Sequence, residues 1–341
     1  MNNFNIIKHN NTQEWSRIIN NSVNFDFYHT LSYNLLEKEG EPTLLVQTLE
    51  KSFIALPIII RDIQNSNYKD CTSVYGYAGP ITSEPFKIIS KDLLKQFQDN
   101  MVTFFKENKI ISCFSRLHPV FENYKILEGL GKTIDLNKTI VIDLNLPIDE
   151  QRRKYRKSNK YEINKLKKND FVVTEAVNET EIDEFIDIYT DTMRRVNASD
   201  NYYFSRDYFY SFLQNDSFES KLLIAKRNNV ITAGAIFTIT NKLMQYHLAG
   251  TKTEYSRDTP MKLILDEARL LGNKLNLNHL HLGGGVGGSD EDSLYRFKSG
   301  FSDLNLNYKV WQFISNQEIY NQLVKDNNND IESSFFPQYR A

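Results

Sequence analysis

Five of the chain's 14 glycines lie between residues 283 and 288, after a segment that predicts a strand and before one that predicts a helix. Glycine permits positive φ angles and close backbone approach, so main-chain N–H groups there can face an anion or a substrate carbonyl. The run fits neither a phosphate-binding Gly-Lys-Ser/Thr loop nor a dinucleotide fingerprint. Gly283, Gly284 and Gly285 are therefore candidate binding residues, and a flexible surface loop is the alternative interpretation.

A second segment, residues 246–261, leads from a predicted strand into a predicted helix. Thr259 is expected to cap that helix, with Pro260 at its first position. A helix N-terminus offers unpaired N–H groups and a positive dipole to a pyrophosphate or a carboxylate, and Arg257 and Lys252 would add positive charge. Ordinary capping of an amphipathic helix is the alternative interpretation.

Three histidines lie on predicted strands of the same region. His279 and His281 are two residues apart, so they point to one face of their strand, and His247 lies on the preceding strand. No carboxylate or further histidine follows at a spacing typical of metal ligands, so we predict no metal site. We expect one of them to act as a general base, because acylation of an amine needs a proton acceptor near neutral pH.

An aromatic and basic loop between two predicted helices contains Arg195, Tyr202 and Tyr203. These side chains are suited to stack on a nucleotide and to pair with its phosphates. A solvated loop whose aromatic rings enter the core is the alternative.

Residues 152–168 hold nine Lys and Arg against one acid, Glu162, in a helical pattern. Such a face can neutralise the phosphates of tRNA. Such charged side chains usually form a solvent-exposed helix face, so tRNA binding and a simple solvated surface are both possible interpretations.

The composition sets the broad class. The 341 residues are 40% hydrophobic and 25% charged with a net charge of −2, which excludes a mostly disordered chain, a polytopic membrane protein and a general DNA-binding protein. Cys71 and Cys113 are too few for a disulfide framework or a structural zinc site. With no signal peptide in the sequence, a cytoplasmic location is expected. Nothing in the sequence indicates the oligomeric state.

Hydrophobic periodicity predicts an α/β protein in which one order of elements occurs twice, with a boundary near residue 146. Each half reads as a strand, two helices, three strands ending in a Gly-containing turn, a long helix and another strand. In the first half, residues 53–60 form a continuous apolar run that predicts a strand buried on both faces, and the long helix is expected over residues 87–108. In the second half, a helix is expected from about residue 290 to 298.

Five motifs, which follow one another along the chain in the order found in the family, resemble the FemAB-like branch of the GNAT acyltransferase superfamily. The C-terminal block is the best match, with a strand ending His281-Leu-Gly-Gly-Gly and then Ser293-Leu-Tyr-Arg-Phe-Lys-Ser-Gly-Phe301. The other motifs are Tyr75-Gly-Tyr-Ala-Gly-Pro80, the basic stretch 152–160, residues 189–195 and Gly250-Thr-Lys-Thr-Glu-Tyr255. Residues 253–259 replace the pyrophosphate loop of simpler GNAT enzymes.

The resemblance implies two tandem GNAT-like domains, each a mixed, mostly antiparallel sheet flanked by helices. Residues 1–146 would form a non-catalytic domain and residues 147–341 the catalytic one. It also implies acyl transfer from an activated carrier to an amine. We favour acyl-CoA as donor and a nucleotide-linked (dTDP-) amino sugar as acceptor, in the biosynthesis of a surface polysaccharide such as the O-antigen of lipopolysaccharide. The alternatives are an aminoacyl-tRNA-dependent transferase that builds peptidoglycan bridges and a non-catalytic binding protein on a degenerate GNAT fold.

The expected mechanism is direct attack of the amine on the thioester, without an acyl-enzyme. A main-chain N–H at Leu248, Ala249 or Gly250 would polarise the carbonyl. Lys298, which matches the lysine of the family's Phe-Lys pair, would stabilise the oxyanion or hold a phosphate. The proton would go to His247 or, as second choice, His281, and Tyr295 or Ser293 would protonate the thiolate. Arg195, Tyr202 and Tyr203 would bind the acceptor, with Tyr75 and Tyr77 closing the pocket.

Overall fold

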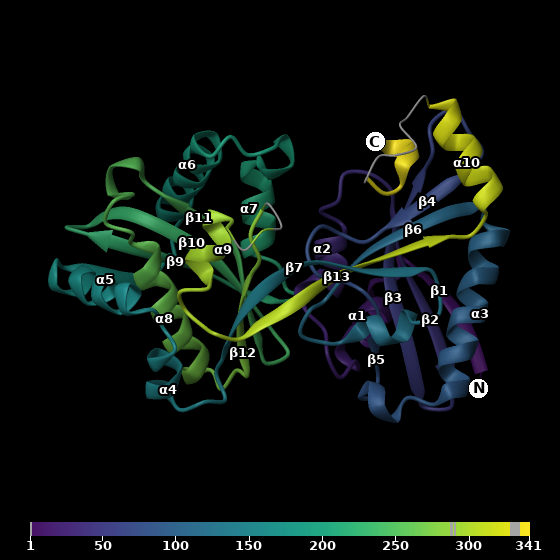
Figure 1. Cartoon of the computed structure of the whole chain (residues 1–341), viewed down its shortest axis with the longest axis horizontal. Helices are drawn as coiled ribbons and strands as arrows, with labels where there is room; N and C mark the ends of the chain where they lie inside the picture. The colour runs from purple at the N-terminus through teal and green to yellow at the C-terminus, as the bar shows by residue number, and fades with distance from the viewer. Residues whose placement is uncertain (1, 287–288, 290, 328–334) are drawn as a thin grey trace. The chain divides into compact units, whose positions relative to one another are not determined.

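The computed structural model describes residues 2–286, 289, 291–327 and 335–341. They form two compact units, the first from the described residues of 2–136 and 307–341 and the second from the described residues of 137–306. Figure 1 labels most helices and strands of both. The predicted α/β class is confirmed, because each unit has a mixed, mostly antiparallel sheet flanked by helices.

The sheet of the first unit has the strand order β1-β2-β3-β4-β6-β13, with β5 paired to β3. Its pairs are antiparallel except β4 with β6. The strands are β1 (Asn2–Lys8), β2 (Glu41–Leu49), β3 (Ser52–Asp62), β4 (Lys69–Thr72), β5 (Ile81–Thr82), β6 (Ile110–Leu117) and β13 (Asn305–Ile314). The helices are α1 (Thr12–Asn20), α2 (Leu31–Asn34), α3 (Lys91–Glu107) and α10 (Gln317–Asp326), with short 3₁₀ turns at 27–29, 86–88, 123–127 and 338–340.

Strand β3 is buried on both faces, as its apolar run predicted. Ile54 and Leu56 join a core cluster with Phe97 of α3, whereas Phe53 and Ala55 join another with Trp15 of α1. Because successive side chains of a strand point to opposite faces, this division means that helices cover both sides of the sheet. The long helix begins at Lys91, after the N-cap Ser90, rather than at residue 87.

The sheet of the second unit has the order β8-β9-β10-β11-β12-β7, and here β11 and β12 are the parallel pair. The strands are β7 (Lys132–Asp143), β8 (Phe171–Glu175), β9 (Glu219–Arg227), β10 (Val230–Thr240), β11 (Leu243–Thr251) and β12 (His279–Gly283). The helices are α4 (Ile148–Arg153), α5 (Lys157–Lys168), α6 (Glu179–Arg195), α7 (Arg206–Leu213), α8 (Met261–Lys274) and α9 (Ser293–Lys298), with 3₁₀ turns at 200–202 and 253–255. Helices α5 and α8 share the core of one sheet face, and α6 and α7 contact β11 and β9.

The two sheets repeat one design. In each, four strands lie in chain order, β1 to β4 or β8 to β11. The fourth strand has a parallel neighbour, β6 or β12, and beyond it lies an antiparallel strand from another part of the chain. For the first unit that last strand is β13, which pairs with β6 from Lys309↔Leu117 to Ile314↔Ser112. For the second it is β7, which pairs with β12. Residues 307–327 and 335–341 therefore belong to the first unit, which differs from the expected ranges 1–146 and 147–341.

Candidate functional site

The pairing of β11 with β12 stops partway along both strands. Their parallel ladder consists of Leu243↔His279, Met244↔Leu280 and Gln245↔His281, whereas β11 continues to Thr251 and β12 to Gly283. We call residues 245–251 of β11 and 281–283 of β12 the strand fork. Beyond the last pair, main-chain groups on this edge of β11 lie outside the ladder, and such groups can bind an extended ligand.

A β-bulge lies inside the fork. Ile236 of β10 pairs with Leu248 and Phe237 with Tyr246, so His247 is the extra residue of β11. A bulge redirects side chains and main-chain groups locally and is common beside functional sites. Gly250 follows, where an added Cβ would lie 2.8 Å from the Cα of Tyr189 in α6. Glycine at that position is explained by close packing of the helix.

The glycine segment leaves β12 at the fork. Gly283 has a φ of 73°, a conformation that favours glycine. An added Cβ at Gly285 would lie 2.2 Å from Oδ1 of Asp292, the oxygen that caps α9 by accepting from Tyr295 N. These two glycines are thus explained by the backbone turn and by packing on α9. Gly287 and Gly288 lie outside the described residues.

Lys298 is the buried cation of the site. It ends α9, is 7% exposed, and its Nζ donates to the carbonyl oxygen of Gly284 across 2.7 Å. The same Nζ lies 5.6 Å from the ring centroid of Tyr246, on β11. Burial lowers the pKa of the Lys298 ammonium to about 7, while the negative charge of Asp292 acts in the opposite direction. At neutral pH this lysine can donate or accept a proton.

His281 and Gln245 form the last pair of the ladder and hydrogen-bond through their side chains, with His281 Nδ1 and Gln245 Oε1 2.5 Å apart. Both are buried. They alternate along their strands with Met244 and Leu280, which belong to the core under α8, so they point to the opposite face. Gln245 was not predicted as a site residue. Its signal in the sequence is a polar amide between apolar neighbours of a strand.

His247 lies against helix α7. Its imidazole stacks on Phe212, with centroids 4.7 Å apart, and its Nε2 is 3.4 Å from the hydroxyl of Tyr208. Tyr208 in turn stacks on Phe204 at 4.1 Å. These rings, also absent from the sequence predictions, hold His247 toward the α7 side of the strand fork.

The predicted acceptor residues are partly brought to the fork. Arg195, at the end of α6, donates to the carbonyl oxygen of Thr251 and to the hydroxyl of Thr253, at 3.0 and 2.8 Å. Its guanidinium therefore lies at the C-terminal end of β11. Tyr203 is 38% exposed, and Tyr202 is tied to α6 through its carbonyl oxygen, which accepts from Tyr189.

The start of helix α8 differs from the expected cap. The helix begins at Met261 with Pro260 as N-cap, and Thr259 has a left-handed φ of 56°. Thr259 contributes its carbonyl oxygen, which accepts from Lys262 N, and its side chain caps nothing. Among the described residues, its buried Oγ1 has no hydrogen-bond partner. The prediction that Thr259 caps the helix was wrong. Thr259 has a left-handed backbone conformation and precedes the N-cap position, which Pro260 occupies. Arg257 nearby is exposed.

Of the other predicted residues, Tyr295 is half-buried and packs on the core of the second unit, whereas Ser293 is exposed at the first position of α9. This helix begins later than the expected residue 290, because Asp292 is its cap. Tyr75 and Tyr77 belong to the first unit, where Tyr77 contacts the rings of Tyr28 and Tyr308. Their closure of a substrate site remains a prediction.

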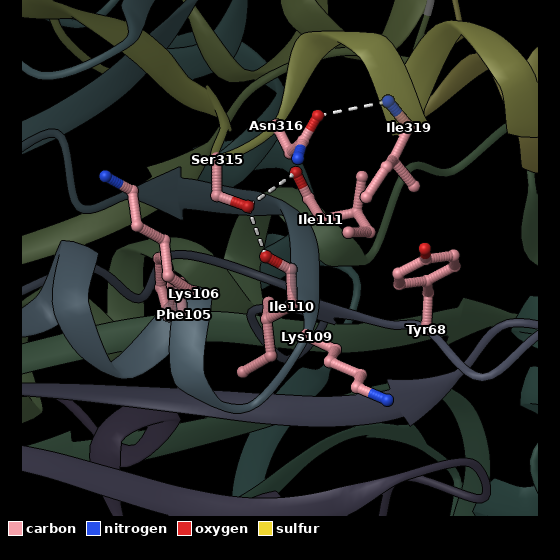
Figure 2. A pocket seen from close by; sticks show the side chains of 9 residues that line it. All are labelled: Tyr68, Phe105, Lys106, Lys109, Ile110, Ile111, Ser315, Asn316 and Ile319. Carbon is pink, nitrogen blue, oxygen red and sulfur yellow. Dashed lines mark hydrogen bonds between the residues drawn. The ribbon is translucent and has the colours of Figure 1, made fainter.

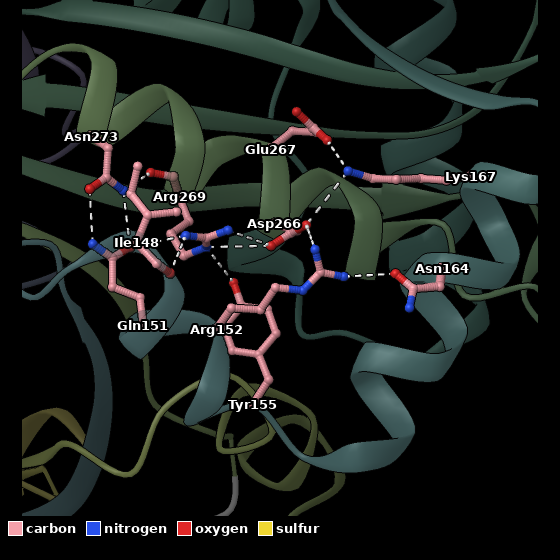
Figure 3. A network of polar contacts seen from close by, with 10 residues as sticks. All are labelled: Ile148, Gln151, Arg152, Tyr155, Asn164, Lys167, Asp266, Glu267, Arg269 and Asn273. Carbon is pink, nitrogen blue, oxygen red and sulfur yellow. Dashed lines mark hydrogen bonds and ion pairs between the residues drawn. The ribbon is translucent and has the colours of Figure 1, made fainter.

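The basic segment is largely a structural element of the second unit (Figure 3). Buried Asp266 of α8 accepts from Arg269 Nη2 at 3.0 Å, and Arg152 and Lys167 each lie 3.8 Å from its other oxygen. Lys154 pairs with Asp303. In α5, Lys157, Lys165 and Lys168 remain exposed. Arg152 of α4 and Lys167 of α5 thus anchor their helices to α8.

A pocket in the first unit is lined by none of the predicted site residues (Figure 2). Its lining includes Phe105, Ile110 and Ile111, with the side chains of Lys106 and Lys109. Two of its polar side chains already have local partners: Ser315 donates to the carbonyl oxygens of Ile110 and Ile111, and Asn316 caps α10. Within the described ranges, no cluster of potential metal ligands and no helix able to cross a membrane occurs.

Comparison with known proteins identifies the fold. No protein-family model and no curated protein matches the sequence. Among solved structures, FemX aligns with a TM-score of 0.70 at 12% identity, over 93% of this chain and 99% of that one. L-PGS from Bacillus licheniformis aligns at 0.59 and 9% identity, over 89% and 92% of the two chains. A tandem GNAT protein from the clavulanic acid biosynthesis pathway aligns at 0.52 and 6% identity, over 93% and 99%. The chain therefore has the fold of the tandem GNAT proteins.

Proposed function

We propose that the protein is an N-acyltransferase that moves an acyl group from acyl-CoA to the amine of a nucleotide-linked amino sugar. The observation that carries this proposal is the strand fork, where an open edge of β11 lies beside the buried Lys298 and the buried His281. The pantetheine arm that carries the thioester of acyl-CoA is extended, and its amides can pair with such an edge. The chain shares the fold of a tandem GNAT protein whose structure is described as being without AcCoA, and by analogy with that protein we propose a CoA-linked donor.

The residues at the start of α8 fit the pyrophosphate of coenzyme A, here the carrier of the acyl group. The positive end of the α8 helix dipole attracts phosphate, while the N–H groups of Lys262, Leu263 and Ile264 already donate to the carbonyl oxygens of Thr259 and Pro260. The unpartnered Oγ1 of Thr259 adds a donor, and exposed Arg257 adds charge. This placement replaces the glycine-rich loop of simpler GNAT enzymes with a turn built on Thr259.

In the reaction, the amine nitrogen attacks the thioester carbonyl carbon, and the C–S bond breaks as the amide forms. Binding both reactants in line supplies much of the rate enhancement. A main-chain N–H of residues 248–250 and the ammonium of Lys298 would stabilise the oxyanion. An imidazole, His247 or His281, accepts the amine proton, and Tyr295 or Ser293 protonates the thiolate. Arg195, Tyr202 and Tyr203 would hold the nucleotide phosphates. The product would serve surface polysaccharide synthesis in the cytoplasm.

A second candidate is transfer of an aminoacyl group from tRNA. The fold likeness to FemX and the exposed lysines 157, 165 and 168 of α5 favour it. Against it, Arg152, Lys154 and Lys167 already face carboxylates, which reduces the charge left for tRNA phosphates. A non-catalytic binding protein on the same fold is the third candidate.

A thiol-release assay distinguishes the three. The protein is mixed with a panel of acyl-CoA donors and with dTDP- or UDP-linked amino sugars, and free thiol and acylated sugar are measured. We expect both products in equal amounts. Turnover only with charged tRNA and a peptidoglycan precursor would establish the aminoacyl alternative. Calorimetric binding of an acyl-CoA or sugar nucleotide without any thiol release would indicate the non-catalytic one.

A further inference from the structure

A row of polar side chains crosses three strands in register at the base of the strand fork. Thr238 of β10 pairs with Gln245 of β11, which pairs with His281 of β12. All three are buried, with exposures of 0%, 2% and 0%. Among the described residues, Thr238 Oγ1 has no hydrogen-bond partner. Packing alone does not explain polar side chains in the middle of a sheet, because burying a polar group costs free energy unless the group is hydrogen-bonded.

The orientation of the Gln245 amide follows from its second contact. Its Nε2 donates to the carbonyl oxygen of Tyr246 at 3.1 Å, which identifies the nitrogen of the amide and places Oε1 toward His281. An amide oxygen only accepts hydrogen bonds, so the proton between these side chains must reside on His281 Nδ1. In a neutral imidazole the other nitrogen, Nε2, is then the proton acceptor.

We infer that Gln245 is a positioning residue that holds His281 as the Nδ1–H tautomer, so that His281 Nε2 accepts the proton of the attacking amine. This inference rests on the proposed function. As the new C–N bond forms, the nitrogen becomes positively charged and gives its proton to Nε2. Gln245 Oε1 then stabilises the imidazolium through the same hydrogen bond. The thiolate that leaves with the C–S electron pair takes its proton from Tyr295 or Ser293.

His247 is less suited to the role of base. The hydroxyl of Tyr208 lies 3.4 Å from its Nε2, and a phenol that donates to this nitrogen competes with the amine proton. His281, in contrast, belongs to the last pair before the ladder of β11 and β12 ends. Its place at the base of the strand fork puts it beside the open edge where the thioester is proposed to bind.

Two substitutions of Gln245 test the assignment. Gln245→Met keeps the length of the side chain and removes the acceptor, so both tautomers of His281 become populated. We expect kcat/KM to fall about tenfold to a hundredfold, part of the contribution of a general base. Gln245→Glu places a carboxylate beside Nδ1–H and stabilises the imidazolium, so the acidic limb of the pH profile of kcat/KM should move to higher pH.

Gln47 offers a matched control in the first unit. It is also a buried strand glutamine whose Nε2 donates to the next residue's carbonyl oxygen and whose Oε1 accepts, here from Asn100. Gln47→Met should leave the pH profile unchanged. Wild-type activity and pH profile in both Gln245 variants would overturn the inference, and so would an equal effect of the control.

A measurement without substrate separates this inference from the proposed function. In ¹⁵N NMR spectra of the whole chain, with His281 assigned by comparison with His281→Asn, we expect a protonated Nδ1 and an unprotonated Nε2. The Gln245→Met spectrum should show a mixture of tautomers. A protonated Nε2 in the wild type overturns the assignment. If no acyl donor is turned over, the proposed function fails, and the tautomer alone decides whether Gln245 positions His281.

Discussion

Lys298 donates a hydrogen bond to the carbonyl oxygen of Gly284 across 2.7 Å and so ties the end of α9 to the glycine segment that follows β12. The contact links the glycine segment to the Phe-Lys pair of α9 and joins residues fourteen positions apart. It also accounts for a buried ammonium, because the carbonyl oxygen and the face of Tyr246 replace part of its hydration.

Replacement of Lys298 by Ala is predicted to lower turnover about tenfold to a thousandfold if its ammonium stabilises the transition state. The measurement is kcat in the thiol-release assay, at saturating concentrations of both substrates. Arg296→Ala is the control, since Arg296 is an exposed cation of the same helix, paired with Glu291. Unchanged kinetics of Lys298→Ala would remove Lys298 from the mechanism.

Lys298 should also make stability depend on pH. Burial lowers its pKa in the folded chain to about 7, whereas an unfolded lysine titrates near 10.4. Between these values the unfolded state binds more protons, so this group's contribution to the free energy of unfolding rises with pH. The variant Lys298→Met has no titrating group at this position and therefore lacks this pH-dependent contribution to the free energy of unfolding. We expect its stability relative to wild type to be highest below pH 7 and to decline toward pH 10, as measured by urea unfolding. A constant difference from pH 6 to pH 10 would contradict the pKa shift.

The order of elements was predictable because it depends on local periodicity. The apolar run of β3 indicated burial on two faces, and the repeated order of strands and helices indicated two similar units. The pairing of β13 with the sheet of the first unit was not predictable from the sequence. Strand β13 pairs with β6, almost two hundred residues earlier, and nothing in the local pattern of residues 305–314 indicates which sheet it joins.

At the site, the sequence identified individual residues better than their relationships. Lys298 and His281 were predicted, but their partners Gly284 and Gln245 depend on contacts between segments. The failed cap at Thr259 has a similar cause, because its left-handed backbone conformation is rare for a β-branched residue and has no sequence signal. Motifs indicate which residue types meet a chemical need, and only the packed chain decides which atoms face one another.

Buried histidines of the first unit predict a loss of stability in acid. Burial, with a smaller contribution from the charge of His118, lowers the pKa of His29 to about 4. An unfolded histidine titrates near 6.5, so the stability that neutral His29 contributes is full above pH 6.5 and is lost progressively as the pH falls toward 4. His29→Asn should therefore show a shallower decline of the free energy of unfolding between pH 6.5 and 4. His9→Asn, which changes an exposed histidine, should follow the wild-type curve. Parallel curves for His29→Asn and wild type would contradict this prediction.

The C-terminal residues of the chain are predicted to stabilise the first unit through Asp70. This carboxylate is fully buried and accepts from Arg340 Nε at 2.5 Å, from Arg61 Nε at 2.9 Å and from the hydroxyl of Tyr339 at 3.2 Å. Arg340→Gln leaves the buried charge with fewer donors, so we expect the free energy of unfolding to fall by about 1–3 kcal/mol.

A double-mutant cycle measured by equilibrium urea unfolding tests whether this loss comes from Asp70. With Asp70→Asn as the second change, the Arg340→Gln substitution should cost less than in the wild-type background, because the charge that needed the guanidinium is gone. Arg17→Gln, which breaks an exposed pair with Glu14, should cost only about 0.5 kcal/mol. Strictly additive effects of Arg340→Gln and Asp70→Asn would mean that the C-terminal segment stabilises the unit through other contacts, such as the packing of Tyr339 against Tyr320.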